Sequence, residues 1–110
     1  MARVPLAKLA YARSGDKGSA ANIGVIARST AAFELLKEHL TASRVEEYFR
    51  PMGVGKVVRY ELPNLEAFNF ILPDILNGGG SVSLRIDAQG KALGQVLLEM
   101  ELEIAEEVKL

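Results

Sequence analysis

The sequence predicts an α+β fold in two layers, with a mostly antiparallel sheet and helices packed on one of its faces. Segments in which apolar and polar residues alternate are interspersed with segments whose apolar residues recur every three or four positions. The alternating segments are charged on one side only, which is typical of a sheet that helices cover on one face. The length, 110 residues, predicts one domain over residues 1–110.

The composition narrows the classes of function. Apolar residues make up 49% and charged residues 25%, as in ordinary folded proteins. The net charge of −1 offers no basic excess for phosphates, which argues against nucleic acid. The absence of cysteine excludes disulfides, thiolate ligands and a thiol nucleophile. No signal peptide and no apolar run of roughly 20 residues is seen, so we expect a cytoplasmic protein without membrane contact.

Two strands are expected first, over residues 4–12 and 22–28. In the second, Ile23, Val25 and Ala27 share one face. The two strands could form a hairpin whose loop is longer than a tight turn requires. Loops of that kind are often functional.

Two helices follow. Ser29 or Thr30 is a suitable N-cap for a helix running to about residue 40, whose apolar stripe begins at Phe33. Thr41 can cap a second helix, and Ser43 with Glu46 offers an alternative capping box. We expect the second helix to end before proline at residues 50–51.

The second half of the chain predicts further strands around another helix. Residues 58–62 alternate as in a half-buried strand, with Val58, Tyr60 and Leu62 toward the core. A helix is expected over residues 64–72, and strands over 82–86 and 98–104. Between residues 91 and 97 the pattern also allows a helical turn.

The charged side of these strands is expected either to be solvated or to contact a second subunit. Its glutamates are explained more simply by strand alternation than as paired catalytic carboxylates. The residues on that side are Arg59, Glu61, Arg85, Glu99, Glu101 and Glu103.

Residues 13–22 form the densest polar segment of the chain and predict a site for an anion. Glycines let backbone N–H groups approach an anion closely. Arg13 suits a bidentate grip on a carboxylate or phosphate, and Lys17 supplies a point charge. Asp16 is a candidate acid or base, because a neighbouring cation would shift its pKa. A glycine-rich hairpin with solvated charges remains the alternative. The candidate ligand-binding residues of this segment are Arg13, Ser14, Gly15, Lys17, Gly18 and Asn22.

A second glycine-rich segment spans residues 77–80 and includes Gly78 and Gly79. It predicts either close backbone approach to a ligand or a helix C-cap with a connector. The spacing of Gly15 and Gly18 matches the G-x-x-G of KH domains, but strand-like flanks and the acidic balance argue against RNA. His39 is the only histidine, so neither a metal site nor another cofactor is expected.

Three blocks of the sequence resemble the C-terminal domain of AtuA-type acyclic-terpene-utilisation proteins. They are residues 13–18 with 21–28, residues 60–70, and residues 77–80 with 83–91. The resemblance covers roughly residues 5–104 and implies a ferredoxin-like domain, here as a stand-alone small chain. It also implies a link to bacterial breakdown of branched isoprenoid acids, whose intermediates are CoA thioesters.

The resemblance implies binding positions but no catalytic residue. Residues that match are those of the 13–22 segment named above, together with Asn69, Gly78 and Gly79. Where relatives often carry an acidic residue after the Gly-Asp-Lys-Gly segment, this chain has Ser19 and Ala20, which argues against a metal site.

Two functions follow as hypotheses. The first is an accessory domain or subunit of an AtuA-type catabolic system, whose Gly-Asp-Lys-Gly segment binds an anionic acyl or CoA ligand. Its expected partners are further copies of itself or a separate large AtuA-type subunit. The second is a non-catalytic oligomerisation or interaction module without a ligand. The sequence leaves open whether the protein is an enzyme.

Overall fold

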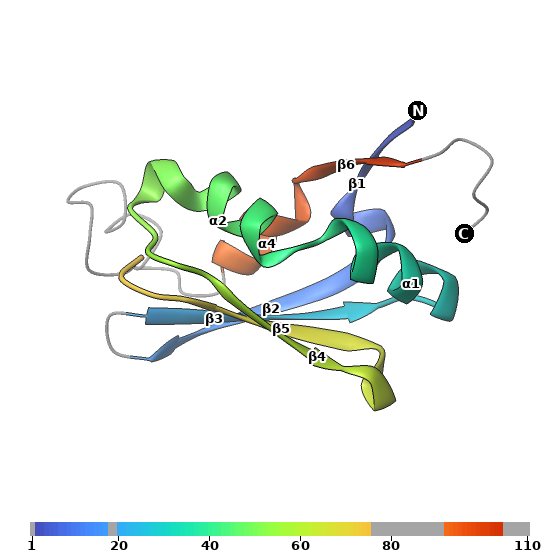
Figure 1. Cartoon of the computed structure of the whole chain (residues 1–110), viewed down its shortest axis with the longest axis horizontal. Coiled ribbons are helices and arrows are strands. Elements are labelled where there is room, and N and C mark those ends of the chain that lie inside the picture. Colours follow the sequence, from blue (N-terminus) through green and yellow to red (C-terminus); the bar gives the residue numbers. More distant parts are fainter. Residues whose placement is uncertain (1, 18–19, 76–91, 105–110) are drawn as a thin grey trace.

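The computed structural model describes residues 2–17, 20–75 and 92–104, with the backbone alone for Ala2, Asp16, Lys17 and Ala92. The described chain forms two layers (Figure 1). One layer is a four-stranded antiparallel sheet, and the other holds the helices and a short two-stranded sheet. The predicted α+β fold with helices on one face of a mostly antiparallel sheet is confirmed.

The larger sheet has the strand order β2-β3-β5-β4. Each neighbouring pair is antiparallel. The central strands β3 and β5 are therefore flanked on both sides, and β2 and β4 are the edges of the described sheet. The bounds are Ala10–Lys17 for β2, Ala20–Ala27 for β3, Val58–Leu62 for β4 and Ala67–Leu72 for β5.

The second layer contains α1 (Thr30–His39), α2 (Ala42–Phe49) and α4 (Ala92–Leu98). Beside them, β1 (Ala2–Pro5) pairs antiparallel with β6 (Glu101–Ile104). All of these elements lie on the same side of the four-stranded sheet (Figure 1). Short 3₁₀ helices are η1 (Leu6–Lys8), η2 (Arg50–Met52) and η3 (Pro63–Leu65).

Both predicted helix caps are confirmed. The Ser29 hydroxyl accepts a hydrogen bond from the backbone N–H of Ala32 at 3.0 Å, and Thr41 accepts one from Arg44 at 3.1 Å. These bonds satisfy N–H groups that have no partner within the helix. The alternative capping box does not form, because Glu46 accepts from the backbone N–H of Val57 instead.

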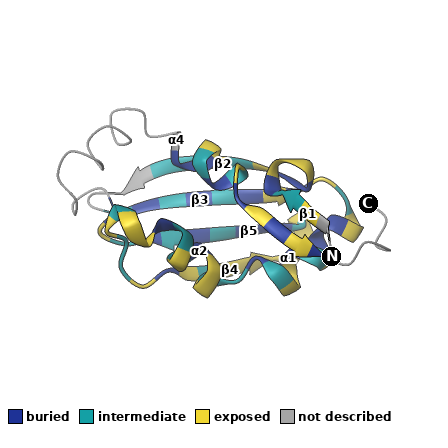
Figure 2. Ribbon diagram, turned by 90° about the horizontal axis from the view of Figure 1, so that it is seen from above, coloured by how far each residue is buried: buried dark blue, intermediate teal, exposed yellow. Residues whose placement is uncertain are grey.

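The core lies between the two layers. Alternate residues of β3 and β5, among them Val25 and Phe68, are fully buried on the helix side. The ring of Phe68 stacks on that of Phe33 from α1, with ring centres 5.0 Å apart. Burial of these large apolar side chains is the main force that holds the helices on the sheet. The central strands are accordingly the most buried part of the sheet (Figure 2).

The single strand predicted over residues 4–12 is wrong, because the segment divides into β1, η1 and β2. Leu6 and Leu9 are both fully buried at a spacing of three, which suits a 3₁₀ turn rather than a strand. The backbone N–H of Leu6 donates to the carbonyl oxygen of Met100, which carries the chain on from β1 beside β6.

The helix predicted over residues 64–72 is also wrong. The segment forms η3 and then β5. Phe68 and Leu72 satisfy both a helical spacing and strict alternation, whereas Leu65 is 67% exposed and adds nothing to a buried stripe. Glu66 has a φ of 50°, a left-handed conformation that ends η3 and prevents a continuous helix.

The last predicted strand, over residues 98–104, is shorter than expected. Leu98 ends α4, so the helical alternative for residues 91–97 is confirmed, and the strand is confined to β6. Glu101 and Glu103 form exposed ion pairs with Arg3 of β1. They therefore belong to the smaller sheet. The strand predicted over 82–86, Arg85 within it and the glycine segment over 77–80 lie outside the described residues.

The bounds of β4 are as predicted, but its side chains face the opposite sides of the sheet from those predicted. Val58, Tyr60 and Leu62 face away from the helices, and their side chains are 42%, 54% and 40% exposed. Arg59 and Glu61 lie on the helix side instead. Arg59 donates to the carbonyl oxygens of Lys37 and Leu40, where α1 ends, and forms an ion pair with Glu61. These bonds satisfy carbonyls that the end of a helix leaves without partners.

Replacing Phe68 by alanine tests the described core. We expect Phe68→Ala to lower the free energy of unfolding by about 3–5 kcal/mol, because it leaves a cavity beneath α1. Leu65→Ala is the control, with an expected change within about 0.5 kcal/mol at its exposed position. Urea titration followed by circular dichroism measures both. Equal losses in the two variants would contradict the assignment of Phe68 to the core.

Candidate functional site

The polar segment 13–22 is a strand pairing rather than a long loop. The β2–β3 ladder runs from Ala10 opposite Ala27 to Lys17 opposite Ala20. Residues 18 and 19 alone separate the two strands, so the prediction of a loop longer than a tight turn is wrong. In an antiparallel ladder, backbone groups bond across to the partner strand. The N–H groups that β2 directs at β3 are therefore committed to the sheet and do not form an anion cradle.

The strand pairing places four predicted binding residues on one face of the sheet. Gly24 lies opposite both Arg13 of β2 and Asn69 of β5. The side-chain amide of Asn22 donates to the side-chain oxygen of Asn69 at 3.3 Å. Gly15 lies opposite Asn22, and a Cβ there would come within 3.1 Å of its side-chain oxygen. We call this group, Arg13, Gly15, Asn22, Gly24 and Asn69, the polar corner.

Ser14 belongs to the other side of β2. Its hydroxyl oxygen accepts a hydrogen bond from the backbone N–H of Gly94 in α4 at 3.1 Å. A Cβ on Gly94 would lie 3.4 Å from the backbone nitrogen of Ser14, so glycine allows α4 to approach β2 closely. Ser14 thus holds α4 against the strand and is not a member of the polar corner.

A hollow of about 410 Å³ lies along β2, lined by Ala12, Arg13, Ser14 and Gln95. Arg13 is the charged residue of this lining, and it is exposed. Since Arg13 also belongs to the polar corner, this residue lies at the edge of both the hollow and the polar corner. Arg13 and Ser14 are thus two sequence-predicted site residues that line a concavity of the described chain.

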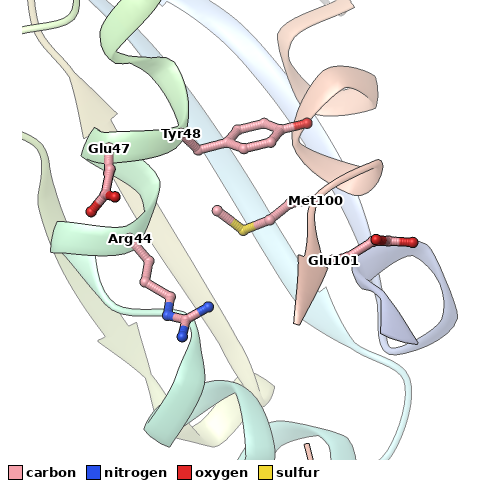
Figure 3. A pocket seen from close by; sticks show the side chains of 5 residues that line it. All are labelled: Arg44, Glu47, Tyr48, Met100 and Glu101. Atoms are coloured by element: carbon pink, nitrogen blue, oxygen red, sulfur yellow. The ribbon is translucent and has the colours of Figure 1, made fainter. Parts of the chain in front are cut away.

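A second hollow, of about 530 Å³, lies between α2 and the start of β6 and contains none of the predicted site residues. Its lining consists of Arg44, Glu47, Tyr48, Met100 and Glu101. The ring of Tyr48 crosses from α2 toward α4, and its hydroxyl donates to the carbonyl oxygen of Val96 at 2.7 Å (Figure 3). Periodicity in the sequence indicates the helix that carries Tyr48 but contains no signal for this hollow.

The hydroxyl of Tyr48 has a pKa above its usual value. Burial, which removes water from the charged phenolate, is the larger cause, and the negative charge of Glu99 is the smaller. The neutral hydroxyl is thereby favoured as the donor to Val96. The group acts as a link between α2 and α4.

Several predicted residues cannot be assigned to the polar corner. Only the backbone of Asp16 and Lys17 is described, opposite Ala21 and Ala20, and Gly18, Gly78 and Gly79 lie outside the described residues. His39 is half-buried in the last turn of α1. Within the described ranges, no three histidine, cysteine, aspartate or glutamate side chains are placed to hold a metal ion.

The fold and the sheet face together define the class of protein. Helices on one face of an antiparallel sheet, with the other face free of described elements, form a ferredoxin-like α+β domain. The family model of the AtuA ferredoxin-like domain matches residues 4–103, and the chain belongs to this family. The comparisons with curated proteins and with solved structures gave no match. No helix in the described part of the chain is both long and apolar enough to cross a bilayer.

Removing the Tyr48 hydroxyl tests its part in the fold. We expect Tyr48→Phe to lower the free energy of unfolding by about 1 kcal/mol at neutral pH, through loss of the hydrogen bond to Val96. Above pH of about 10, the unfolded chain releases the tyrosine proton before the folded chain does, so the wild-type protein loses stability as the pH rises further.

The difference in stability between wild type and Tyr48→Phe should therefore shrink above that pH. Urea titrations of both proteins from neutral to alkaline pH measure it. Tyr11→Phe, at a tyrosine that is 55% exposed, is the matched control. A constant difference across this range would contradict the account of Tyr48.

Proposed function

We propose that the chain is a small accessory domain or subunit of an AtuA-type catabolic system that degrades branched acyclic isoprenoid or acyl-CoA compounds. In this proposal Arg13 binds the anionic group of a ligand. Membership of the AtuA ferredoxin-like domain family supports the accessory role. The observation that carries the binding role is the position of Arg13 between the hollow along β2 and the polar corner.

Arg13 has the chemistry that an anionic group requires. A guanidinium group offers N–H donors in a planar fork that fits a carboxylate or phosphate. None of the ion pairs among the described residues involves Arg13. Its charge is therefore available to a ligand at an exposed position beside a concavity.

The neighbours of Arg13 supply neutral hydrogen bonds and space. Asn22 and Asn69 orient each other through the hydrogen bond between their side-chain amides, and each retains further donors and acceptors. Gly24 carries no side chain above the sheet, so the backbone beside Arg13 is open on that face. Lys17 as a second cation and Asp16 as an acid or base remain parts of the proposal, as do the glycine positions 18, 78 and 79.

A non-catalytic interaction module is the second candidate function. One observation favours it, namely the exposed apolar side chains that share the sheet face with the polar corner. They are Tyr11, Ile26, Val58, Tyr60 and Leu62.

Neutral substitutions of the two proposed cations test the ligand-binding role. We expect Arg13→Gln and Lys17→Gln each to weaken binding of isovaleryl-CoA roughly 10- to 100-fold, since a hydrogen bond to a charged group contributes about 1.5–3 kcal/mol. Isothermal titration calorimetry with isovaleryl-CoA, free coenzyme A and isovalerate separates the contributions of the acyl and phosphate groups.

Arg3→Gln is the matched control, because Arg3 is an exposed arginine of β1 in the other layer. It should bind isovaleryl-CoA like the wild-type chain. Arg13→Gln and Lys17→Gln variants that also bind each of these compounds like the wild type would contradict the proposal. A wild-type chain that binds none of them would contradict it as well.

A further inference from the structure

The outward side of the four-stranded sheet, which we call the open face, is not covered by any described element. The α-helices α1, α2 and α4 and the β1–β6 pair lie on the opposite side (Figure 1). The strand registers arrange its residues in rows that run across β2, β3, β5 and β4. The first row is Gly15, Asn22, Ile71 and Val58; the second is Arg13, Gly24, Asn69 and Tyr60; the third is Tyr11, Ile26, Ala67 and Leu62.

The open face combines exposed apolar side chains with cations at one margin. Tyr11 is 55% exposed, Ile26 45% and Tyr60 54%. The described charges on this face are Arg13 and Arg28, both on the β2–β3 side. The Arg28 guanidinium lies 3.9 Å from the ring centre of Tyr11 and donates to the carbonyl oxygen of Ala7. The exposed apolar side chains lie along β4 and the third row, beside Asn22 and Asn69 on the central strands. An exposed apolar surface of this kind is typical of an interaction site.

We infer that a second copy of this chain docks on the open face, related by a two-fold axis that runs parallel to the strands between β3 and β5. Most homodimers have two-fold symmetry, in which one patch contacts its own copy. A rotation about this axis keeps each row at its level and reverses its order. It places β2 of one copy over β4 of the other, and β3 over β5.

The second and third reversed rows are complementary in size. In the second row, Arg13 of each copy lies over Tyr60 of the other, which suits a cation above an aromatic ring. Gly24 lies over Asn69, so the polar side chain enters the space that glycine leaves. In the third row, Tyr11 faces Leu62.

Ile26 of the third row faces Ala67, again a large residue against a small one. These contacts occur twice, and they bring the exposed apolar residues of both copies into one layer. Such aligned packing of two sheets is common, with strands about 30° apart and sheets about 10 Å apart.

The other two-fold axis in the plane of the face, perpendicular to the strands, fits poorly. With this axis along the second row, each residue of that row would meet its own copy. Arg13 would face Arg13, which brings like charges together, and Gly24 would face Gly24, which leaves a void. The parallel axis avoids both, because it keeps the Arg13 side chains at opposite margins of the interface.

The inferred dimer is a separate property from the proposed ligand binding, and its formation requires no ligand. The two roles of Arg13 are compatible, because a guanidinium group stacks through its planar face and donates hydrogen bonds through its edge. Tyr60 of the second copy would then form one wall of the site at Arg13.

The open face is small. Four strands spaced about 4.8 Å apart and paired over about six residues cover roughly 20 Å by 20 Å. Two such faces bury about 800 Å², below a standard interface, so we expect association in the micromolar range.

Charge-altering variants at the paired positions test the arrangement. Arg13→Glu alone places a carboxylate over Tyr60 of the other copy, and Tyr60→Arg alone places a cation over Arg13. Each change should raise the dimer dissociation constant roughly tenfold or more. Mixing the two variants should restore dimers, because a heterodimer contains one new ion pair and one native Arg13–Tyr60 contact. Within one copy the two positions lie at opposite edges of the sheet, so this rescue requires two chains.

Analytical ultracentrifugation across the micromolar range measures association, and circular dichroism confirms that each variant is folded. Lys8→Glu, at an exposed position of η1, is the charge-matched control and should associate like the wild-type chain. Wild-type dimers, weakened single variants and a restored mixture would support the inference. A wild-type chain that stays monomeric would overturn it and indicate a different protein as the occupant of the open face. Single variants that dimerise like the wild type would overturn it too.

Discussion

The register between β3 and β5 is the constraint on which the rest of the structure depends. Side chains of a strand alternate between its two sides, so one pairing decides both faces of the sheet at once. Pairing Gly24 with Asn69 directs Val25 and Phe68 toward the helices, where they are fully buried. The same pairing leaves Gly24 and Asn69 on the outward side. The core, the polar corner and the open face are therefore consequences of a single alignment. A shift of one residue would put the polar residues of one strand on the same side as the apolar residues of the other.

Structural features that depend only on nearby residues in the sequence, such as helix caps, were predictable. Ser29 and Thr41 are caps because their side chains bond within one turn, and both helices begin where these residues predict. The secondary structure of the second half of the chain was harder to predict. The spacing of Phe68 and Leu72 fits a helix and a strand equally well. The segment forms a strand because it pairs with β3 and extends the inward face of that strand. The reversed orientation of β4 has a similar origin, because Arg59 bonds to carbonyl groups at the end of α1 that no local pattern reveals.

The sequence indicated several residues that lie together in the candidate site, but not the secondary structure that carries them. Arg13, Asn22 and Asn69 do share one face, although the sequence offered a loop rather than a ladder. Pairing of β2 with β3 commits backbone groups that a free loop would have offered to an anion. The binding potential therefore rests on the side chain of Arg13. Ser14, one residue away, turns to the helix side and holds α4, which follows directly from strand alternation once the ladder is known.

Strand register is measured most directly by nuclear Overhauser effects between backbone protons on paired strands. In an antiparallel pair, directly opposed residues have Cα atoms about 4.5–5.5 Å apart, close enough for strong cross-strand signals. The account predicts such signals between Gly24 and Asn69, and between Asn69 and Tyr60. Signals that instead connect Gly24 to Phe68 or Phe70 as its directly opposed partner would show a one-residue shift. That result would place Asn69 on the opposite face of the sheet from Arg13 and Gly24, and it would contradict the account.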